Sequence, residues 1–174
     1  MSMIIYDKHL NEFDKEWVVT HIAVTASDTV STVKDAPSIF HWCFSLVLEP
    51  GQSQNKSVVI DMQPVNPPIG VMIISSNPEA ESKAANKVEI AILTRGRPTV
   101  SQIINVFLEH NIQRYKFDDS GSGCLFWLFT GLRFLEEREL VEHGAVEKAE
   151  TFHKKQAETH PERHPMPFRK GEFY

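Results

Sequence analysis

Cys124 and His41 are the residues of this chain whose types, surroundings and order suit nucleophilic chemistry. Cys124 follows the glycine-rich stretch Ser120-Gly121-Ser122-Gly123 and opens an apolar run that is typical of a helix buried on all sides. At the first turn of a helix, free backbone N–H groups and the positive end of the helix dipole favour a thiolate over a thiol. A thiolate attacks carbonyl carbon when a base lies beside it and a third group orients that base.

The strand patterns place His41 where it can act as this base. Residues 41–48 alternate between an apolar face and a face that carries His41, and residues 57–63 alternate in the same way. If the two strands pair as a hairpin with their apolar faces together, only registers with an even position sum are allowed. His41 is then directly across from Asp61 or Gln63, with the other on the diagonal. Asp61 and Gln63 are therefore both candidates for the group that orients the imidazole.

Three alternatives compete with this interpretation. Cys43 shares a face with His41 and is a second candidate thiol, although it lacks a helix N-terminus. Cys124, followed by Leu-Phe-Trp, also fits a small buried hydrophobe. The chain is then a non-catalytic domain that binds a small molecule or a protein, or a cofactor-free biosynthetic enzyme that works through a shape-selective pocket. The sequence leaves the choice between an enzyme and a binding domain open.

The surrounding pattern predicts an α+β fold. We expect about five antiparallel strands packed against a buried helix, with a second helix capped by Thr99. The buried helix is expected to run from Cys124 to about Leu140. The predicted strands cover residues 17–24, 41–48, 57–63, 70–75 and 87–94.

The whole chain, residues 1–174, is expected to form a single domain. Residues 1–15 are expected to be an irregular lead-in that docks through Ile4, Ile5 and Tyr6, and residues 145–158 to be polar and exposed. The tail, residues 159–174, is interrupted by prolines. His160 and His164 have a spacing that suits a metal, but a solvated tail without a cysteine partner predicts no metal site. We also expect no cofactor.

Composition limits the partners. The chain of 174 residues is 41% hydrophobic and 24% charged, with a formal net charge of −5. Without a basic stripe we expect no nucleic-acid binding, and without an apolar run of about 18 residues we expect no membrane span. The two cysteines form no disulfide framework, which favours a reducing, cytoplasmic location. A small molecule or peptide remains as the expected substrate, and the oligomeric state stays open.

The order His41, Asp61 or Gln63, Cys124 resembles circularly permuted papain-like enzymes, the group that contains the lecithin:retinol acyltransferase and NlpC/P60-like proteins. The stretch from Tyr115 through Cys124 to Trp127 is similar to their aromatic-loop-cysteine-aromatic element. The resemblance implies a permuted papain-like fold and hydrolysis or acyl transfer at an amide, ester or thioester. We expect Gln63, Cys43 and Tyr115 to be binding residues beside the catalytic Cys124, His41 and Asp61. Two positions depart from the pattern: Gly123 replaces the usual asparagine, and residues 57–63 lack the second histidine of the acyltransferase branch.

A second resemblance covers nearly the whole chain. The segments His41-Trp42-Cys43-Phe44, Val59-Ile60-Asp61-Met62, Gly123-Cys124-Leu125-Phe126-Trp127 and Lys170-Gly171-Glu172-Phe173-Tyr174 look like a family of uncharacterised fungal single-domain proteins. This resemblance implies a fungal source and carries no activity with it.

Overall fold

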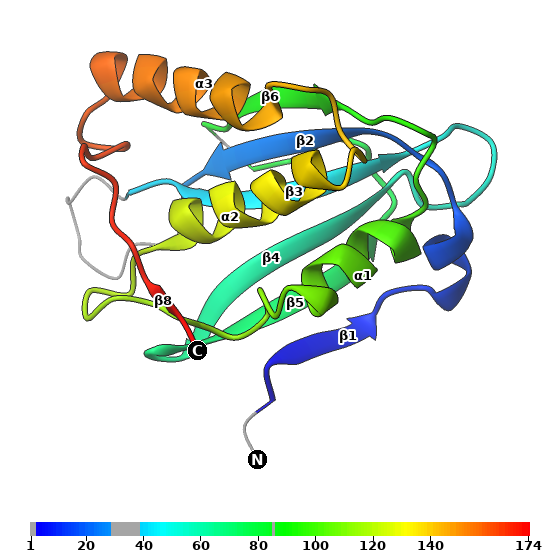
Figure 1. The fold of residues 1–174 in the computed structure, drawn as a ribbon, viewed down its shortest axis with the longest axis horizontal. Helices are drawn as coiled ribbons and strands as arrows, with labels where there is room; N and C mark the ends of the chain where they lie inside the picture. The colour runs from blue at the N-terminus through cyan, green and yellow to red at the C-terminus, as the bar shows by residue number, and fades with distance from the viewer. Residues whose placement is uncertain (1–2, 29–38, 85) are drawn as a thin grey trace.

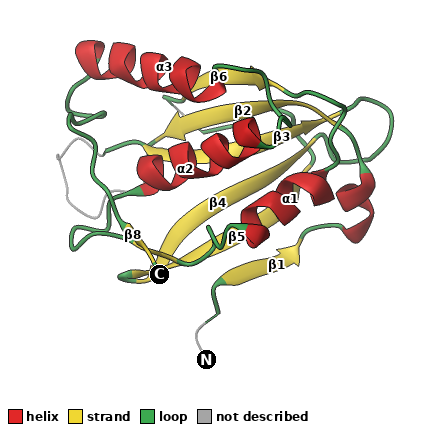
Figure 2. Ribbon diagram, viewed as in Figure 1, coloured by secondary structure: helices red, strands yellow, loops and turns green. Residues whose placement is uncertain are grey.

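The computed structural model describes residues 3–28, 39–84 and 86–174, which form a mixed α+β fold (Figures 1 and 2). Eight strands make one curled sheet, and three α-helices lie together on one of its faces. The helices are α1 (Val100–Glu109), α2 (Cys124–Glu137) and α3 (Ala145–Thr159). The strands are β1 (Ile5–His9), β2 (Val19–Ser27), β3 (His41–Leu48), β4 (Ser57–Asn66), β5 (Ile69–Asn77), β6 (Val88–Leu93), β7 (Tyr115–Lys116) and β8 (Glu172–Phe173).

The strands follow the order β6-β2-β3-β4-β5-β7-β8, and neighbours in this path are antiparallel. The remaining strand, β1, pairs in parallel with β5. The predicted count of about five strands is therefore wrong, and β1, β7 and β8 account for the difference. Both β7 and β8 are two residues long, too short to show a period of two.

The lead-in prediction needs a related correction. Residues 5–9 are not irregular, because they form β1 with Ile5 opposite Met72 and Tyr6 opposite Ile73. Polar side chains that face solvent from this strand hide it from pattern analysis. The expected docking at Ile4 is seen as a hydrogen bond of 2.9 Å from the Met72 amide to the Ile4 carbonyl.

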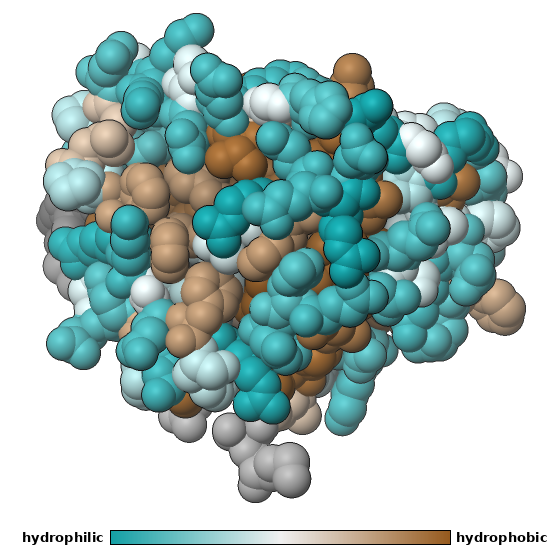
Figure 3. All heavy atoms as spheres, viewed as in Figure 1, coloured by the Kyte–Doolittle hydropathy of each residue, from teal (hydrophilic) through white to brown (hydrophobic). Residues whose placement is uncertain are grey.

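The core lies between the sheet and the helices. Phe44 of β3 contacts Phe107 of α1 and Trp127 of α2, with ring centroids 5.5 and 5.6 Å apart. The Trp127 indole also donates a hydrogen bond of 2.9 Å to the Ile112 carbonyl. These contacts fix α2 against the centre of the sheet, as the apolar run after Cys124 predicts. On the helix side of the molecule, apolar atoms show through between more hydrophilic side chains (Figure 3).

The predicted cap of α1 is confirmed. The Thr99 side chain accepts from the Gln102 amide at 3.2 Å, and the Gln102 side chain accepts from the Thr99 amide at 2.8 Å. This reciprocal pair is a capping box, which satisfies two backbone donors at the helix start.

Residues 145–158 are not simply exposed, and the tail after them is not simply solvated. His153 of α3 and His164 of the tail are only 2% and 1% exposed. Both imidazoles pack against Trp42 of β3 with centroids 5.8 Å away, and they lie 6.0 Å from each other. The apolar faces of imidazole rings fill an aromatic cluster here, a role that polar composition does not reveal.

Candidate functional site

Strands β3 and β4 bring His41 and Asp61 together. The structure pairs Phe44 with Ile60 and Ser45 with Val59, so this register, continued towards His41, sets Cys43 opposite Asp61 and His41 on the diagonal. His41 Nε2 donates a hydrogen bond to Asp61 Oδ1, and the two side chains are 17% and 18% exposed. The predicted contact between these residues is therefore confirmed. Of the two candidates, Asp61 is the one that meets the imidazole.

Gln63 holds the other side of the same carboxylate. Its Nε2 donates to Asp61 Oδ2 at 2.5 Å, so each carboxylate oxygen of Asp61 has a separate donor. Two donors on one carboxylate restrict its rotation and fix the direction from which it meets the imidazole. Among the described residues no hydrogen bond joins Gln63 directly to His41, so Asp61 is the hydrogen-bonded link between the two side chains.

Cys124 is the first residue of α2, as its position after the glycine turn predicts. The residue before it, Gly123, has φ +133°, and no side chain caps the helix. A Cβ at position 123 would lie 2.8 Å from both the Gly171 amide nitrogen and the Tyr115 hydroxyl. This close packing leaves no room for a side chain such as asparagine at position 123. As at every helix start, the first N–H groups of α2 have no intrahelical acceptor, and here no side chain caps them.

The imidazole of His41 interacts with Cys124 as well as with Asp61. In Figure 1 the first turn of α2 and the start of β3 lie at the same end of the sheet. Burial by itself would lower the pKa of His41, but the charge of Cys124, that of Asp61 and hydrogen bonds to both raise it well above its ordinary value. Since Asp61 occupies Nε2, Nδ1 is the nitrogen left for the sulfur. Cys124, His41 and Asp61 are called the candidate triad below.

Tyr115 lies beneath this triad rather than in it. It is fully buried, its hydroxyl donates to the Gly123 carbonyl at 2.6 Å, and it accepts from the Gly171 amide at 2.8 Å. Burial raises the pKa of Tyr115 far above its ordinary value, so the hydroxyl keeps its proton. Tyr115 thereby links the start of α2 to the chain just before β8.

Cys43 lies beside the triad on the same face of β3. Burial first, and then the nearby charges of Asp61, Cys124 and Glu89, raise the pKa of the Cys43 thiol far above its ordinary value. Cys43 therefore stays a thiol. Cys124, in contrast, has the imidazole of His41 as a partner. Of the two cysteines, only Cys124 has the surroundings of a nucleophile.

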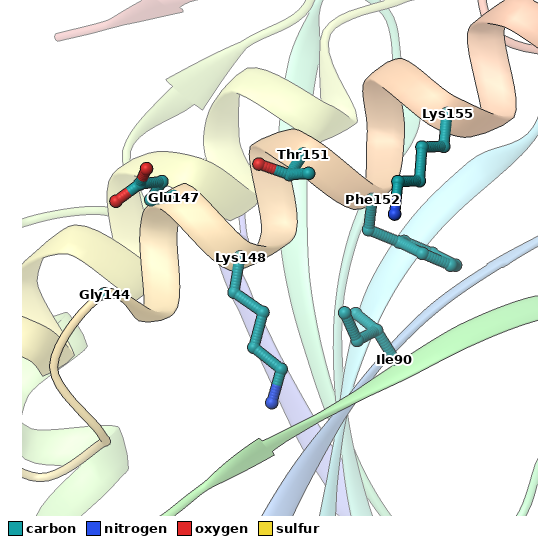
Figure 4. Close-up of a pocket in the computed structure, with 7 residues that line it drawn as sticks. All are labelled: Ile90, Gly144, Glu147, Lys148, Thr151, Phe152 and Lys155. Atoms are coloured by element: carbon teal, nitrogen blue, oxygen red, sulfur yellow. The ribbon is translucent and has the colours of Figure 1, made fainter.

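The described residues contain no group of three or more side chains that suits a metal ion. His164, one of the two tail histidines with metal-like spacing, is enclosed by aromatic rings, and His160 is exposed. A separate open hollow of about 400 Å³ lies between α3 and β6, lined by Ile90, Lys148, Thr151 and Phe152 among others (Figure 4). It includes no member of the triad.

Two features of the site escape sequence analysis. The Tyr115–Gly171 contact joins residues far apart in the chain, and its one visible sign is the glycine in the closing segment Lys170-Gly171-Glu172-Phe173-Tyr174. The His153–His164 pair has no sign at all, because both residues lie in polar stretches.

The described residues thus make an α+β protein with a cysteine, a histidine and an aspartate assembled at one end of its sheet. Comparison with known proteins places the chain in a family: residues 20–174 match the domain of unknown function DUF7770, and the chain belongs to that family. Searches of curated proteins and of solved structures found no match. In the described part of the chain, none of the helices has the length and apolar character needed to cross a bilayer.

Proposed function

We propose that the protein is a cysteine-dependent hydrolase or acyltransferase that acts on an amide, ester or thioester carbonyl. The observation that carries this proposal is the double engagement of His41, which meets Asp61 through Nε2 and also interacts with Cys124. An imidazole between a carboxylate and a thiol is the arrangement that activates sulfur nucleophiles. If His41 served only to pack, it would not need both a carboxylate and a thiol as partners.

In the proposed reaction Cys124 attacks and His41 moves the proton. The Cys124 sulfur bonds to the carbonyl carbon, and the bond to the leaving group breaks as that group takes a proton from the His41 imidazolium. Neutral His41 then accepts a proton from the incoming water, alcohol or amine, which releases the acyl group from sulfur. Asp61, held in turn by Gln63, keeps the imidazole in place during both transfers.

The start of α2 supplies donors for the developing oxyanion. The first N–H groups of a helix have no intrahelical acceptor, and no side chain caps them here. They lie beside the sulfur, where an oxygen of the tetrahedral intermediate would form. The same helix end provides a positive potential for negative charge.

The order of the triad along the chain supports a permuted papain-like arrangement. His41 on β3, Asp61 on β4 and Cys124 at the start of α2 follow the layout of those enzymes. Gly123 and the missing second histidine in residues 57–63 are the two departures. We propose a shared catalytic layout on this basis, together with the fungal source that the sequence resemblance implies.

The decisive experiment compares three single variants on a panel of activated esters, thioesters and anilides. Cys124→Ala and His41→Ala should each abolish turnover, with circular dichroism and the melting temperature close to those of the wild type. Cys43→Ala is the matched control and should keep turnover, because its thiol has no imidazole partner. Iodoacetamide at pH 6 should alkylate Cys124 before Cys43, as read by peptide mass spectrometry.

Turnover that survives in Cys124→Ala would overturn the proposal, as would equal labelling of both cysteines. Either result would favour the alternative, a binding domain or a cofactor-free enzyme in which Cys124 only packs.

A further inference from the structure

A pocket opens on the face of the sheet that carries His41 and Asp61. It has a volume of about 250 Å³ and lies where residues 77–83 cover the centre of β2, β3 and β4. A hydrogen bond of 2.6 Å from the Ser57 hydroxyl to the Glu79 carbonyl fixes this cover to β4. Among the side chains that line the pocket are Thr25, Cys43, Ser45, Val59, Asn77 and Lys83.

The pocket includes no member of the candidate triad, but it lies along the row of side chains on β3 that begins with His41. Cys43 is the next residue after His41 on this face of β3, and Ser45 is the one after that. At roughly 3.4 Å per residue, the two side chains follow the imidazole at about 7 Å and about 14 Å. Thr25 is the cross-strand partner of Cys43, and Val59 is that of Ser45, so both rows face the same space. A substrate held at Cys124 can therefore extend over Cys43 into this pocket.

Ser45 indicates that the pocket has a polar occupant. The residue is 6% exposed, and its hydroxyl has no hydrogen-bond partner among the residues that the structure describes. The hydroxyl is not among the fully buried polar atoms that lack a partner, so it is open to the pocket. A ligand there can form a hydrogen bond with it without displacing a protein partner. Thr25, equally buried, donates to Glu89 at 3.3 Å and can still accept a bond from a ligand.

The charges around the pocket are already paired, which favours a neutral ligand. Lys83 lies 3.2 Å from Glu79, and Lys87 lies 3.9 Å from Glu89. The groups left for recognition are hydroxyls, a thiol and the amide nitrogen of Asn77, whose oxygen accepts from the Glu79 backbone. A long alkyl chain would leave these groups without partners. The volume is also below the roughly 300–1,000 Å³ of typical small-molecule pockets.

We infer that this pocket binds a neutral, amide-bearing group about one amino-acid residue in size, so that the substrates of Cys124 are aminoacyl or peptidyl compounds rather than long-chain acyl compounds. The inference rests on the proposed function for the reacting carbonyl. For the group beside that carbonyl, the inference depends on the pocket alone.

A pair of isosteric thioesters tests this selectivity. N-acetylglycyl and 4-methylpentanoyl thioesters of one common thiol have the same shape, but only the first carries an amide. The wild type should have the higher kcat/KM for the N-acetylglycyl thioester. Ser45→Ala should reduce the ratio of the two kcat/KM values roughly three- to tenfold, the effect of one lost neutral hydrogen bond. Thr151→Ala removes a hydroxyl from the separate hollow beside α3 and should leave the ratio unchanged.

A binding experiment separates the pocket from the chemistry. N-acetylglycinamide should shift the backbone amide resonances of Ser45 and Val59 in the Cys124→Ala protein, and 4-methylpentanamide should shift them less. Binding without turnover in the wild type would overturn the proposed function and leave the pocket standing. Turnover with no preference for the amide, or with a preference that Ser45→Ala does not change, would overturn the pocket. Absence of both binding and turnover would overturn both.

Discussion

His41 owes its raised pKa to two neighbours, Cys124 and Asp61, of which Asp61 bonds the Nε2 atom. Burial opposes the proton, and Cys124 and Asp61 together outweigh burial. Because the folded-state pKa lies above the ordinary value, the imidazolium persists at neutral pH and is lost only as the pH rises further. In the proposed mechanism this proton serves the leaving group, so activity should fall on the alkaline side when His41 deprotonates.

Asp61→Asn should move that alkaline fall to lower pH. The variant removes the negative charge that favours imidazolium, while the shape of the side chain stays the same. At neutral pH kcat/KM should drop by a factor within the roughly 10²–10⁴ that positioned acid–base catalysis contributes. The pH profile of kcat/KM and the pH titration of the His41 ring protons by NMR measure the two effects. An unchanged profile would show that Asp61 does not act on His41.

Gln63→Leu should have a smaller effect of the same kind. The variant removes the donor on Asp61 Oδ2 and leaves the His41–Asp61 contact in place. A loss of roughly three- to tenfold in kcat/KM is expected, with KM little changed. Gln52→Leu, at a partly buried glutamine that bonds Glu49 near the opposite end of β3, is the matched control. A loss in Gln63→Leu as large as that in Asp61→Asn would instead mean that Gln63 meets the substrate.

The short pair β7 and β8 sets the position of α2. The Tyr115 hydroxyl joins the Gly123 carbonyl to the Gly171 amide, and Phe173 packs on the Tyr115 ring with centroids 4.8 Å apart. A Cβ on Gly171 would lie 2.1 Å from the Lys116 carbonyl oxygen, so the two strands approach as closely as a glycine allows. The start of α2 is therefore held by a side chain from one strand and backbone from the segment beside the other.

Tyr115→Phe should loosen the start of α2 while keeping the ring in the core. The lost hydroxyl leaves a buried carbonyl and a part-buried amide each without one partner, which costs about 1–3 kcal/mol of unfolding free energy. Alkylation of Cys124 by iodoacetamide should slow as its helix end becomes less ordered. Tyr6→Phe removes an exposed hydroxyl that bonds His9 at 3.4 Å and should change neither quantity. Denaturant unfolding and labelling rates provide the measurements, and an unchanged labelling rate in Tyr115→Phe would contradict the linkage.

Elements in which a hydrophobic pattern repeats over many residues could be predicted from the sequence. Elements that depend on partners far away in the chain could not. The alternation in β3 and β4 gave both strands and the allowed register, because one slipped residue would turn Phe44 and Ile60 away from the core. The cap of α1 followed from Thr99 and the start of α2 from the glycine turn. The strand β8 exists only because Tyr115 and Lys116 offer it an edge, so no local pattern marks it. Register does not explain the choice of Asp61 over Gln63 either. The observed register, continued to His41, sets Gln63 directly opposite, yet the imidazole bonds Asp61 on the diagonal.

The cluster of Trp42, His153 and His164 joins three distant parts of the fold. It connects β3, α3 and the tail, and the Phe40 amide donates to the Arg163 carbonyl at 3.0 Å beside it. Burial, and then the neighbouring His164, lower the pKa of His153 to about 4, and burial lowers that of His164. The folded protein therefore holds both rings neutral in a place where protons are poorly tolerated.

The protein should lose stability as the pH falls from about 6.5 to about 4. An unfolded chain protonates these histidines near their ordinary pKa, but the folded chain does not, so acid favours unfolding. Above pH 6.5 the two neutral histidines make their full contribution to the free energy of unfolding. Near pH 4, His153 alone accounts for a loss of up to about 3 kcal/mol of that free energy. His153→Phe, which suits the aromatic surroundings, should flatten the dependence of unfolding free energy on pH in this range. His143→Phe, at an exposed histidine, should not, and equal slopes in the wild type and His153→Phe would contradict the assignment.

The C-terminal segment makes a hydrogen bond close to each half of the candidate triad. The Arg163 carbonyl accepts from the amide of Phe40, the residue before His41, and the Gly171 amide donates to the Tyr115 hydroxyl, which in turn bonds the carbonyl of Gly123 before Cys124. A ribosome makes the chain from its N-terminus, so the thiol, the imidazole and the carboxylate all emerge before either of these contacts can form. During synthesis the three candidate groups are thus present before these two contacts can form. Under the proposed function, the site is completed only after the C-terminal segment has been made.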